Sequence, residues 1–191
     1  MDALDVLENI REKDCPVNTL LQEVKKNKCN DCGKCTFGYE GITQMDLILT
    51  DLTEKKGKSG DLPLLRELSE MMESQSLCEE GMDIARAAAF ALREYAPVFE
   101  SHAAKKECRA GVCKKFMTHH ILPERCTGCG DCMDVCDEDA ILGKKKFVHI
   151  IVMDECTQCG ACVSACEEDA IILAGTKKPR TPKKPIPCKA R

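Results

Sequence analysis

The hydrophobic residues in the first half of the chain recur at intervals of three and four positions. This spacing places them on one face of an α-helix and predicts helices over residues 17–26, 36–53 and 61–74. Asp61 stands where the cap of the third helix is expected. A further, long helix is predicted after Cys78, from the apolar positions Ile84, Ala88, Leu92, Tyr95 and Phe99.

In the second half, hydrophobic side chains alternate over a short stretch, as is typical of a β-strand. Residues 144–153 follow this alternation and predict a β-hairpin. On either side of this stretch the sequence repeats itself: residues 126–141 and 156–171 are identical at ten of sixteen positions, at a period of 30. Two copies of one small structural unit are therefore expected.

Cysteine adds chemistry to this pattern. The 191 residues include 16 cysteines, no tryptophan, two tyrosines and five phenylalanines, so the cores are small and need crosslinks or metals. The N-terminus, Met1 to Asp5, lacks the basic start and apolar stretch of an export signal, which favours metal-bound thiolates over disulfides. No apolar run approaches the length of a membrane-spanning helix. We expect a soluble, cytoplasmic protein whose formal charge of -4 predicts neither nucleic-acid nor membrane binding.

Each copy of the repeat carries four cysteines in the spacing Cys-x2-Cys-x2-Cys-x3-Cys. Bacterial ferredoxins hold 4Fe-4S clusters with this spacing, and the fourth cysteine of each copy binds the cluster of the other copy. Zinc knuckles also use four cysteines, but the doubled quartet disfavours them. Asp137 and Glu167 replace the proline that usually follows the fourth cysteine. The sequence therefore does not predict the backbone path after this cysteine, but the expected ligands are unchanged. The expected ligand sets are Cys126, Cys129, Cys132 and Cys166 for one cluster, and Cys156, Cys159, Cys162 and Cys136 for the other.

A third cluster site is predicted in the first half of the chain. Cys29, Cys32 and Cys35 have the same tight interval, but no fourth cysteine follows at the ferredoxin distance. The two predicted helices that come next run away from this triplet and back again, which returns the chain to it at Cys78. Cys78 is therefore the predicted fourth ligand, and its place at a helix N-terminus favours a thiolate.

The stretches CNDCGKCTFGYEG and SLCEEGM, with the helical hairpin between them, resemble the helical iron-sulfur domain that ends the NADH-binding subunit of respiratory complex I. Residues 27–174 are similar to part of the beta subunit of NAD-linked, electron-bifurcating iron-only hydrogenases, in which such a domain precedes a two-cluster ferredoxin domain. The resemblance implies an electron-transfer subunit bound to a flavin- and NAD-binding subunit and to a second redox protein. No Gly-x-Gly-x-x-Gly loop occurs, so we expect neither flavin nor NAD on this chain, which looks like the distal electron-transfer part of that family.

Four cysteines remain outside the three quartets. Cys108 and Cys113 lie in the connector between the two halves, and His102 is six residues upstream of Cys108. Two thiols and an imidazole at this spacing predict a small zinc site.

The fourth zinc ligand is left open between Cys15 and one of the histidines His119 and His120. Cys15 begins the helix that leads to the cluster cysteines, and the long helix after the cluster ends near His102, so both are expected on the side remote from the cluster. Cys188, in the C-terminal tail, is expected to be a free thiol.

We therefore expect an α+β protein with a helical bundle cluster domain followed by a ferredoxin-like domain with two clusters. It has no nucleophile and base arrangement, hence no catalytic residues and no substrate chemistry of its own. The alternatives to an electron-transfer subunit are a free low-potential ferredoxin, which has no need for the helical domain, and an iron- or oxygen-sensing protein. The predicted domains are a helical extension at 1–26, a helical cluster domain at 27–101, a connector at 102–120, a ferredoxin domain at 121–174 and a basic, proline-rich, extended or disordered tail at 175–191.

Overall fold

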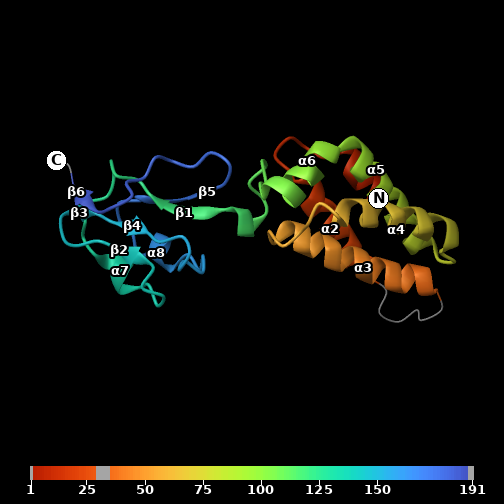
Figure 1. The fold of residues 1–191 in the computed structure, drawn as a ribbon, viewed down its shortest axis with the longest axis horizontal. Coiled ribbons are helices and arrows are strands. Elements are labelled where there is room, and N and C mark those ends of the chain that lie inside the picture. The colour runs from red at the N-terminus through yellow and green to blue at the C-terminus, as the bar shows by residue number, and fades with distance from the viewer. Residues whose placement is uncertain (1, 29–34, 189–191) are drawn as a thin grey trace. The chain divides into compact units, whose positions relative to one another are not determined.

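The computed structural model describes residues 2–28 and 35–188. The chain divides into two compact units, Met1–Phe116 and Met117–Arg191, and the division falls inside the predicted connector (Figure 1). The first unit is helical in its described part, whereas the second carries short strands and one-turn helices. Within the described ranges, no helix combines the length and apolar character that crossing a membrane requires.

Four helices form the body of the first unit: α2 (Pro16–Lys26), α3 (Thr36–Thr53), α4 (Asp61–Gln75) and α5 (Glu79–Glu94). They pack side by side and bury the apolar face of each helix (Figure 1). The first three lie where the hydrophobic spacing predicts them, to within one residue at each end. The fully buried side chains of this core include Leu20, Val24, Met45, Leu49, Leu65, Met72, Ile84 and Ala88.

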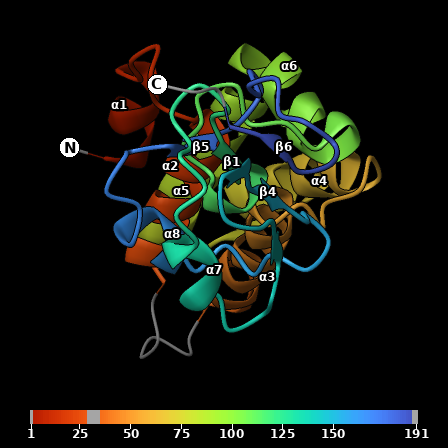
Figure 2. The same cartoon turned by 90° about the vertical axis from the view of Figure 1, so that its left-hand side faces the viewer.

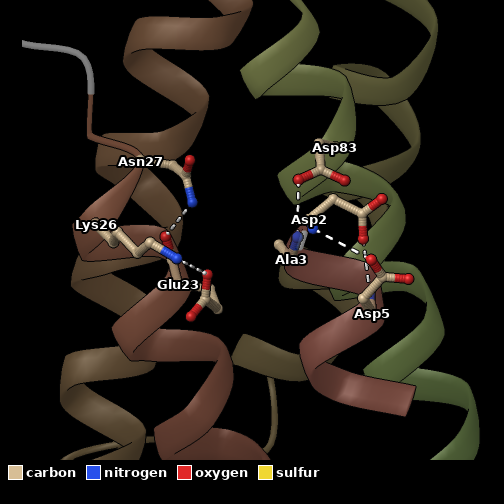
Figure 3. Close-up of polar contacts among 7 residues, drawn as sticks. All are labelled: Asp2, Ala3, Asp5, Glu23, Lys26, Asn27 and Asp83. Atoms are coloured by element: carbon tan, nitrogen blue, oxygen red, sulfur yellow. Dashed lines mark hydrogen bonds and ion pairs between the residues drawn. The ribbon is translucent and has the colours of Figure 1, made fainter. Parts of the chain in front are cut away.

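A short helix, α1 (Ala3–Glu8), precedes α2 within the helical extension predicted at 1–26, although no hydrophobic period marks its bounds. Its first turn is closed by a capping box: the Asp5 N–H donates to the Asp2 carboxylate at 2.7 Å, and the Asp2 N–H donates to the Asp5 carboxylate at 3.3 Å (Figure 3). The Ala3 N–H donates to the carboxylate of Asp83 on α5 at 2.9 Å. This bond ties α1 to the helix against which it packs.

The long helix predicted as far as Phe99 is interrupted. Helix α5 ends at Glu94, Tyr95 caps it, and the chain continues as the short helix α6 (Ala96–Glu100) and the π-helical turn Ser101–Lys105. Pro97 explains the break, because its ring removes the N–H that would continue the hydrogen-bond ladder of α5.

The sequence predicts Asp61 as the N-cap of α4, but Asp61 is instead the first residue of the helix. Gly60 takes the cap position, and the Asp61 carboxylate instead accepts the Lys58 N–H at 2.6 Å, which closes the loop that precedes the helix.

The described part of the second unit contains three two-stranded antiparallel sheets and two one-turn helices. The helices α7 (Asp131–Asp134) and α8 (Ala161–Ser164) are related by the repeat and lie next to each other (Figure 2). The strands are β1 (Thr118–Ile121), β2 (Ile141–Leu142), β3 (Phe147–Val148), β4 (Ile150–Ile151), β5 (Ile171–Ala174) and β6 (Ile186–Pro187).

Equivalent strand pairs interlace the two copies of the repeat. Strand β1, ahead of the first copy, pairs with β5 at the end of the second, and β4, ahead of the second copy, pairs with β2 at the end of the first. Ile121 lies opposite Ile171, and Ile151 lies opposite Ile141, so a shift of 30 residues relates one pair to the other. The end of each copy is thereby held against the start of the other.

The hairpin predicted within residues 144–153 is wrong in its pairing. Strand β4 pairs with β2, and β3 pairs with β6 from the C-terminal tail. Alternation of hydrophobic residues predicts a strand but not the strand with which it pairs. Here β4 pairs with β2 of the other copy of the repeat and is not available to β3. The tail is extended at 186–187, and the Cys188 N–H donates to the Lys146 carbonyl at 2.9 Å.

Candidate functional site

Two cavities in the second unit are lined by cysteines from both copies of the repeat. One is lined by Cys136 from the first copy and by Cys156, Cys159 and Cys162 from the second. The other is lined by Cys166 from the second copy and by Cys126, Cys129 and Cys132 from the first. The structure therefore gathers the cysteines in the two crosswise sets that the ferredoxin spacing predicts.

Two glycines let the chain wrap around these cavities. Gly130 and Gly160 precede α7 and α8 with φ values of 112° and 86°, a region that a residue with a side chain rarely enters. The helices that follow bury Cys132 and Cys162, which pack with the isoleucines of the interlaced strands. The sulfurs thus sit against an apolar wall.

The chain leaves both fourth cysteines through the same turn, although neither is followed by proline. The Asp139 N–H donates to the Cys136 carbonyl at 3.1 Å, and the Asp169 N–H donates to the Cys166 carbonyl at 3.2 Å. Both aspartates have positive φ values, 49° and 47°, which aspartate tolerates better than most residues. The missing prolines therefore leave the two copies alike at this point.

The cavities disfavour negative sulfur unless a cation is bound. Burial, followed by the charges of Cys126 and Cys129, raises the pKa of Cys132 to about 12, and burial also raises the pKa of Cys162. Iron cations offset this cost, and four thiolates against an apolar wall suit a 4Fe-4S core. Cys129 and Cys159 are exposed, so each cavity has one edge that a partner can approach.

The site predicted in the first unit is described only in part, because Cys29 and Cys32 lie outside the described residues. Cys35 stands at the N-cap of α3 and Cys78 at the N-cap of α5. Helices α3 and α4 form the hairpin between them, which brings two cysteines that are 43 positions apart in the sequence to the same end of the unit.

The surroundings of these two cysteines are shaped for sulfur. The Cys35 Sγ accepts the Leu77 N–H at 3.0 Å and the Gly38 N–H at 3.2 Å, and these bonds lower the pKa of the Cys35 thiol. Burial raises the pKa of Cys78, so the thiolate expected from its place at a helix N-terminus is not favoured here without a bound cation. Gly38 and Gly81 line the space around the Cys78 sulfur: an added Cβ at Gly38 would collide with it, and one at Gly81 would approach it to 3.0 Å. A thiolate and open room beside it are what a cluster ligand requires.

A separate group of four buried side chains lies in the first unit: Cys15, His102, Cys108 and Cys113. Their ligand atoms all lie within 4.8 Å of one another. The His102 Nε2 is 3.4 Å from the Cys15 Sγ and 3.6 Å from the Cys113 Sγ, and the two sulfurs are 3.7 Å apart. This group could hold a metal ion, and it includes Cys15, whereas His119 and His120 lie in the second unit.

The ring of His102 is oriented for this role. Its Nδ1 lies 2.9 Å from the Val98 carbonyl, which can only accept, so Nδ1 carries the hydrogen and Nε2 faces the sulfurs. Burial by itself lowers the pKa of His102, but Cys108, Cys15 and the Val98 carbonyl raise it to about 10. The sulfurs therefore create a strongly negative potential here, which a cation would offset.

The two units match known iron-sulfur regions. Residues 20–102 match the family described as the NADH-ubiquinone oxidoreductase-F iron-sulfur binding region, and residues 119–167 match the 4Fe-4S dicluster domain. These matches and the gathered cysteines define an iron-sulfur protein with cluster-binding regions of both kinds. Its relatives include the NADP-reducing hydrogenase subunit HndC of Solidesulfovibrio fructosivorans, which is 36% identical over 135 residues. That alignment spans 71% of this chain and 28% of the relative, and it confirms the resemblance found in the sequence.

Three residues near the cluster cysteines of the second unit were not predicted to belong to the cluster sites, and His119 was named only as an alternative zinc ligand. Cys188, expected to be free, is placed by β6 beside Cys126, and burial followed by that neighbour raises the pKa of its thiol. His119 lines one cysteine cavity and His149 lines the other. The two histidines could have been found from the repeat, because His119 and His149 are separated by its period of 30 residues and precede the two copies at equivalent positions.

Proposed function

We propose that this chain is an iron-sulfur electron-transfer subunit that relays single electrons between a nicotinamide-oxidising flavoprotein and a second redox protein. The observation that carries the proposal is the crosswise gathering of the two cysteine quartets, each around its own cavity. When bound, a 4Fe-4S cluster accepts and gives up one electron at a time. The interlaced strands place the two cavities next to each other within one unit.

We assign the third cluster to Cys35 and Cys78 together with Cys29 and Cys32. The hydrogen bonds to the Cys35 sulfur and the room that Gly38 leaves support this assignment. All twelve assigned ligands are cysteines, which leaves no open coordination position for a substrate. These thiolates therefore hold electron carriers, and substrate chemistry belongs to a partner.

We assign zinc to the group formed by Cys15, His102, Cys108 and Cys113. Three sulfurs and one imidazole nitrogen are a common tetrahedral donor set for this ion. All four ligands come from the protein and all are buried, so no position is left for water. Such closed sites stabilise folds, and this one would join the start of α2 to the turns that follow α6.

The proposed partners follow from the chemistry of nicotinamides. NADH gives up a hydride, whereas iron-sulfur clusters take single electrons, so a flavin must lie between them. The match to the iron-sulfur binding region of an NADH-ubiquinone oxidoreductase subunit supports a flavoprotein donor, and the hydrogenase relative supports a second redox partner. We favour a bound subunit over a free ferredoxin because a free carrier does not need the helical unit.

Stopped-flow mixing of the anaerobically reconstituted full chain tests this proposal. We expect about twelve irons per chain, with rapid bleaching of the cluster absorbance by dithionite and none by NADH alone. Rapid bleaching by NADH without a partner would contradict the proposal, as would a reconstituted chain without iron in the second unit.

A further inference from the structure

Two histidines extend the repeat beyond its cysteines. His119, on β1, and His149, between β3 and β4, each stand seven residues before the first cysteine of a copy, at the same period of 30. Each lines the cavity that belongs mainly to the other copy: His119 with Cys156, and His149 with Cys126. The histidines are therefore exchanged between the copies in the same crosswise manner as the fourth cysteines.

His149 already has the geometry of a donor to sulfur. It is 1% exposed, and its Nδ1 lies 3.2 Å from the Sγ of Cys132. A cluster-bound cysteine sulfur has lone pairs only, so the nitrogen that faces it must carry the hydrogen. Gly143 makes room for the ring, because an added Cβ there would collide with the imidazole.

His119 repeats this situation at the other cavity. It is 6% exposed, and its Nδ1 is buried without a hydrogen-bond partner among the described residues. A buried ring nitrogen without a partner is costly, and if it carries the hydrogen, the sulfurs of a bound cluster are the acceptors that this cavity would offer it. Burial lowers the pKa of both histidines, but an imidazole keeps at least one N–H in either protonation state.

The neighbouring histidine shows that burial alone does not produce this arrangement. His120 is 5% exposed, and its Nδ1 is also buried without a hydrogen-bond partner among the described residues, but its Nε2 lies 2.8 Å from the Thr118 hydroxyl and the ring lines neither cysteine cavity. Two of the three histidines of the second unit thus face the cysteines, one at each cavity.

We propose that His119 and His149 each donate an N–H···S hydrogen bond to one cluster of the second unit and thereby raise its reduction potential. The inference rests on the proposed function, because the acceptors are cluster sulfurs. A hydrogen bond to sulfur stabilises the more negative, reduced cluster more than the oxidised one. The repeated histidines would keep both clusters in the same range of potential, as a relay between adjacent sites requires.

Pulsed EPR on the dithionite-reduced full chain, labelled with ¹⁵N-histidine, tests the contact directly. We expect ¹⁵N hyperfine coupling to the reduced clusters in the wild-type protein and its loss in the double variant H119F/H149F. Redox titration should show a shift to lower potential in each single variant, by about tenfold in the reduction equilibrium, which is 59 mV for one electron. H149Q keeps an N–H donor and should recover part of the shift, whereas H120F is the matched control and should have wild-type potentials.

Iron analysis separates the possible failures. A wild-type chain that binds no iron in the second unit would contradict the proposed function itself. A wild-type chain that binds its iron, shows no ¹⁵N coupling and shares its potentials with H119F and H149F would overturn this inference alone. If the phenylalanine variants fail to hold iron, the coupling in the wild-type protein decides the question by itself.

Discussion

Gly38 occupies the first turn of α3, beside the sulfurs of Cys35 and Cys78, where a side chain would intrude on the space for a metal cluster. A Cβ built at this position collides with the Cys78 Sγ, and the backbone of α3 cannot move aside without losing the N–H bond to Cys35. The absence of a side chain is therefore part of the proposed cluster site.

We expect Gly38→Ala to remove about four of the twelve irons and to leave the ferredoxin clusters intact. Gly60→Ala is the matched control, because a Cβ there meets nothing within 4 Å and the backbone at Gly60 is right-handed helical. Iron and sulfide analysis after anaerobic reconstitution measures the loss. Equal iron in both variants would show that the helical site does not need this space.

The interlaced strands are the elements on which both ferredoxin sites depend. Ile171 on β5 is 5% exposed, lines a cysteine cavity and packs with Cys132, whereas Leu173 on the same strand is 49% exposed. Shortening Ile171 opens a gap beside the sulfurs, and a buried Ile→Ala change costs about 2–5 kcal/mol. The repeat predicts the same effect at Ile141, the equivalent position on β2.

We expect Ile171→Ala and Ile141→Ala to lower the guanidinium concentration at which the cluster absorbance is lost, by similar amounts. Leu173→Ala should stay close to the wild-type protein, since little area is buried there. Anaerobic denaturation followed at the cluster band measures all three variants. A much smaller effect at Ile141 than at Ile171 would show that the two sites are not equivalent in stability.

Some of these elements can be predicted from the sequence, and others cannot, for physical reasons. The spacing of Cys126 to Cys136 indicates its chemistry directly, because ligand geometry demands fixed intervals, and α3 is long enough for its apolar face to mark both ends. Helix α1 is too short to show a period, and the pairing of β3 with β6 joins residues about 40 apart that carry no mutual signal. The break at Tyr95 could have been read from Pro97.

At the scale of the whole molecule, the proposed zinc site would hold the first unit together, whereas the proposed iron sites would carry electrons. Cys15 and Cys113 come from opposite ends of that unit, and their sulfurs meet in its core. We expect Cys108→Ala to lose the zinc, to lower the melting temperature of the chain and to keep the iron of the second unit.

Elemental analysis for zinc and iron, with thermal unfolding, checks this expectation. Cys188→Ala is the control for zinc content alone, because Cys188 lies outside the group of four but beside the predicted cluster ligand Cys126. If Cys108→Ala loses iron and keeps zinc, Cys108 is a cluster ligand and the assignment of the two metals must be exchanged.

A metal held by Cys15 and Cys113 also changes how the chain responds to mechanical force. The two cysteines are 98 positions apart, so the metal closes a loop that contains α2 to α6. When the chain is pulled by its ends, tension passes from one cysteine to the other through the metal and bypasses this loop. The loop, which would span about 330 Å when fully extended, bears no tension until a metal–sulfur bond breaks. The resistance of the helical unit to stretching is then set by coordination bonds and not by the packing of its core.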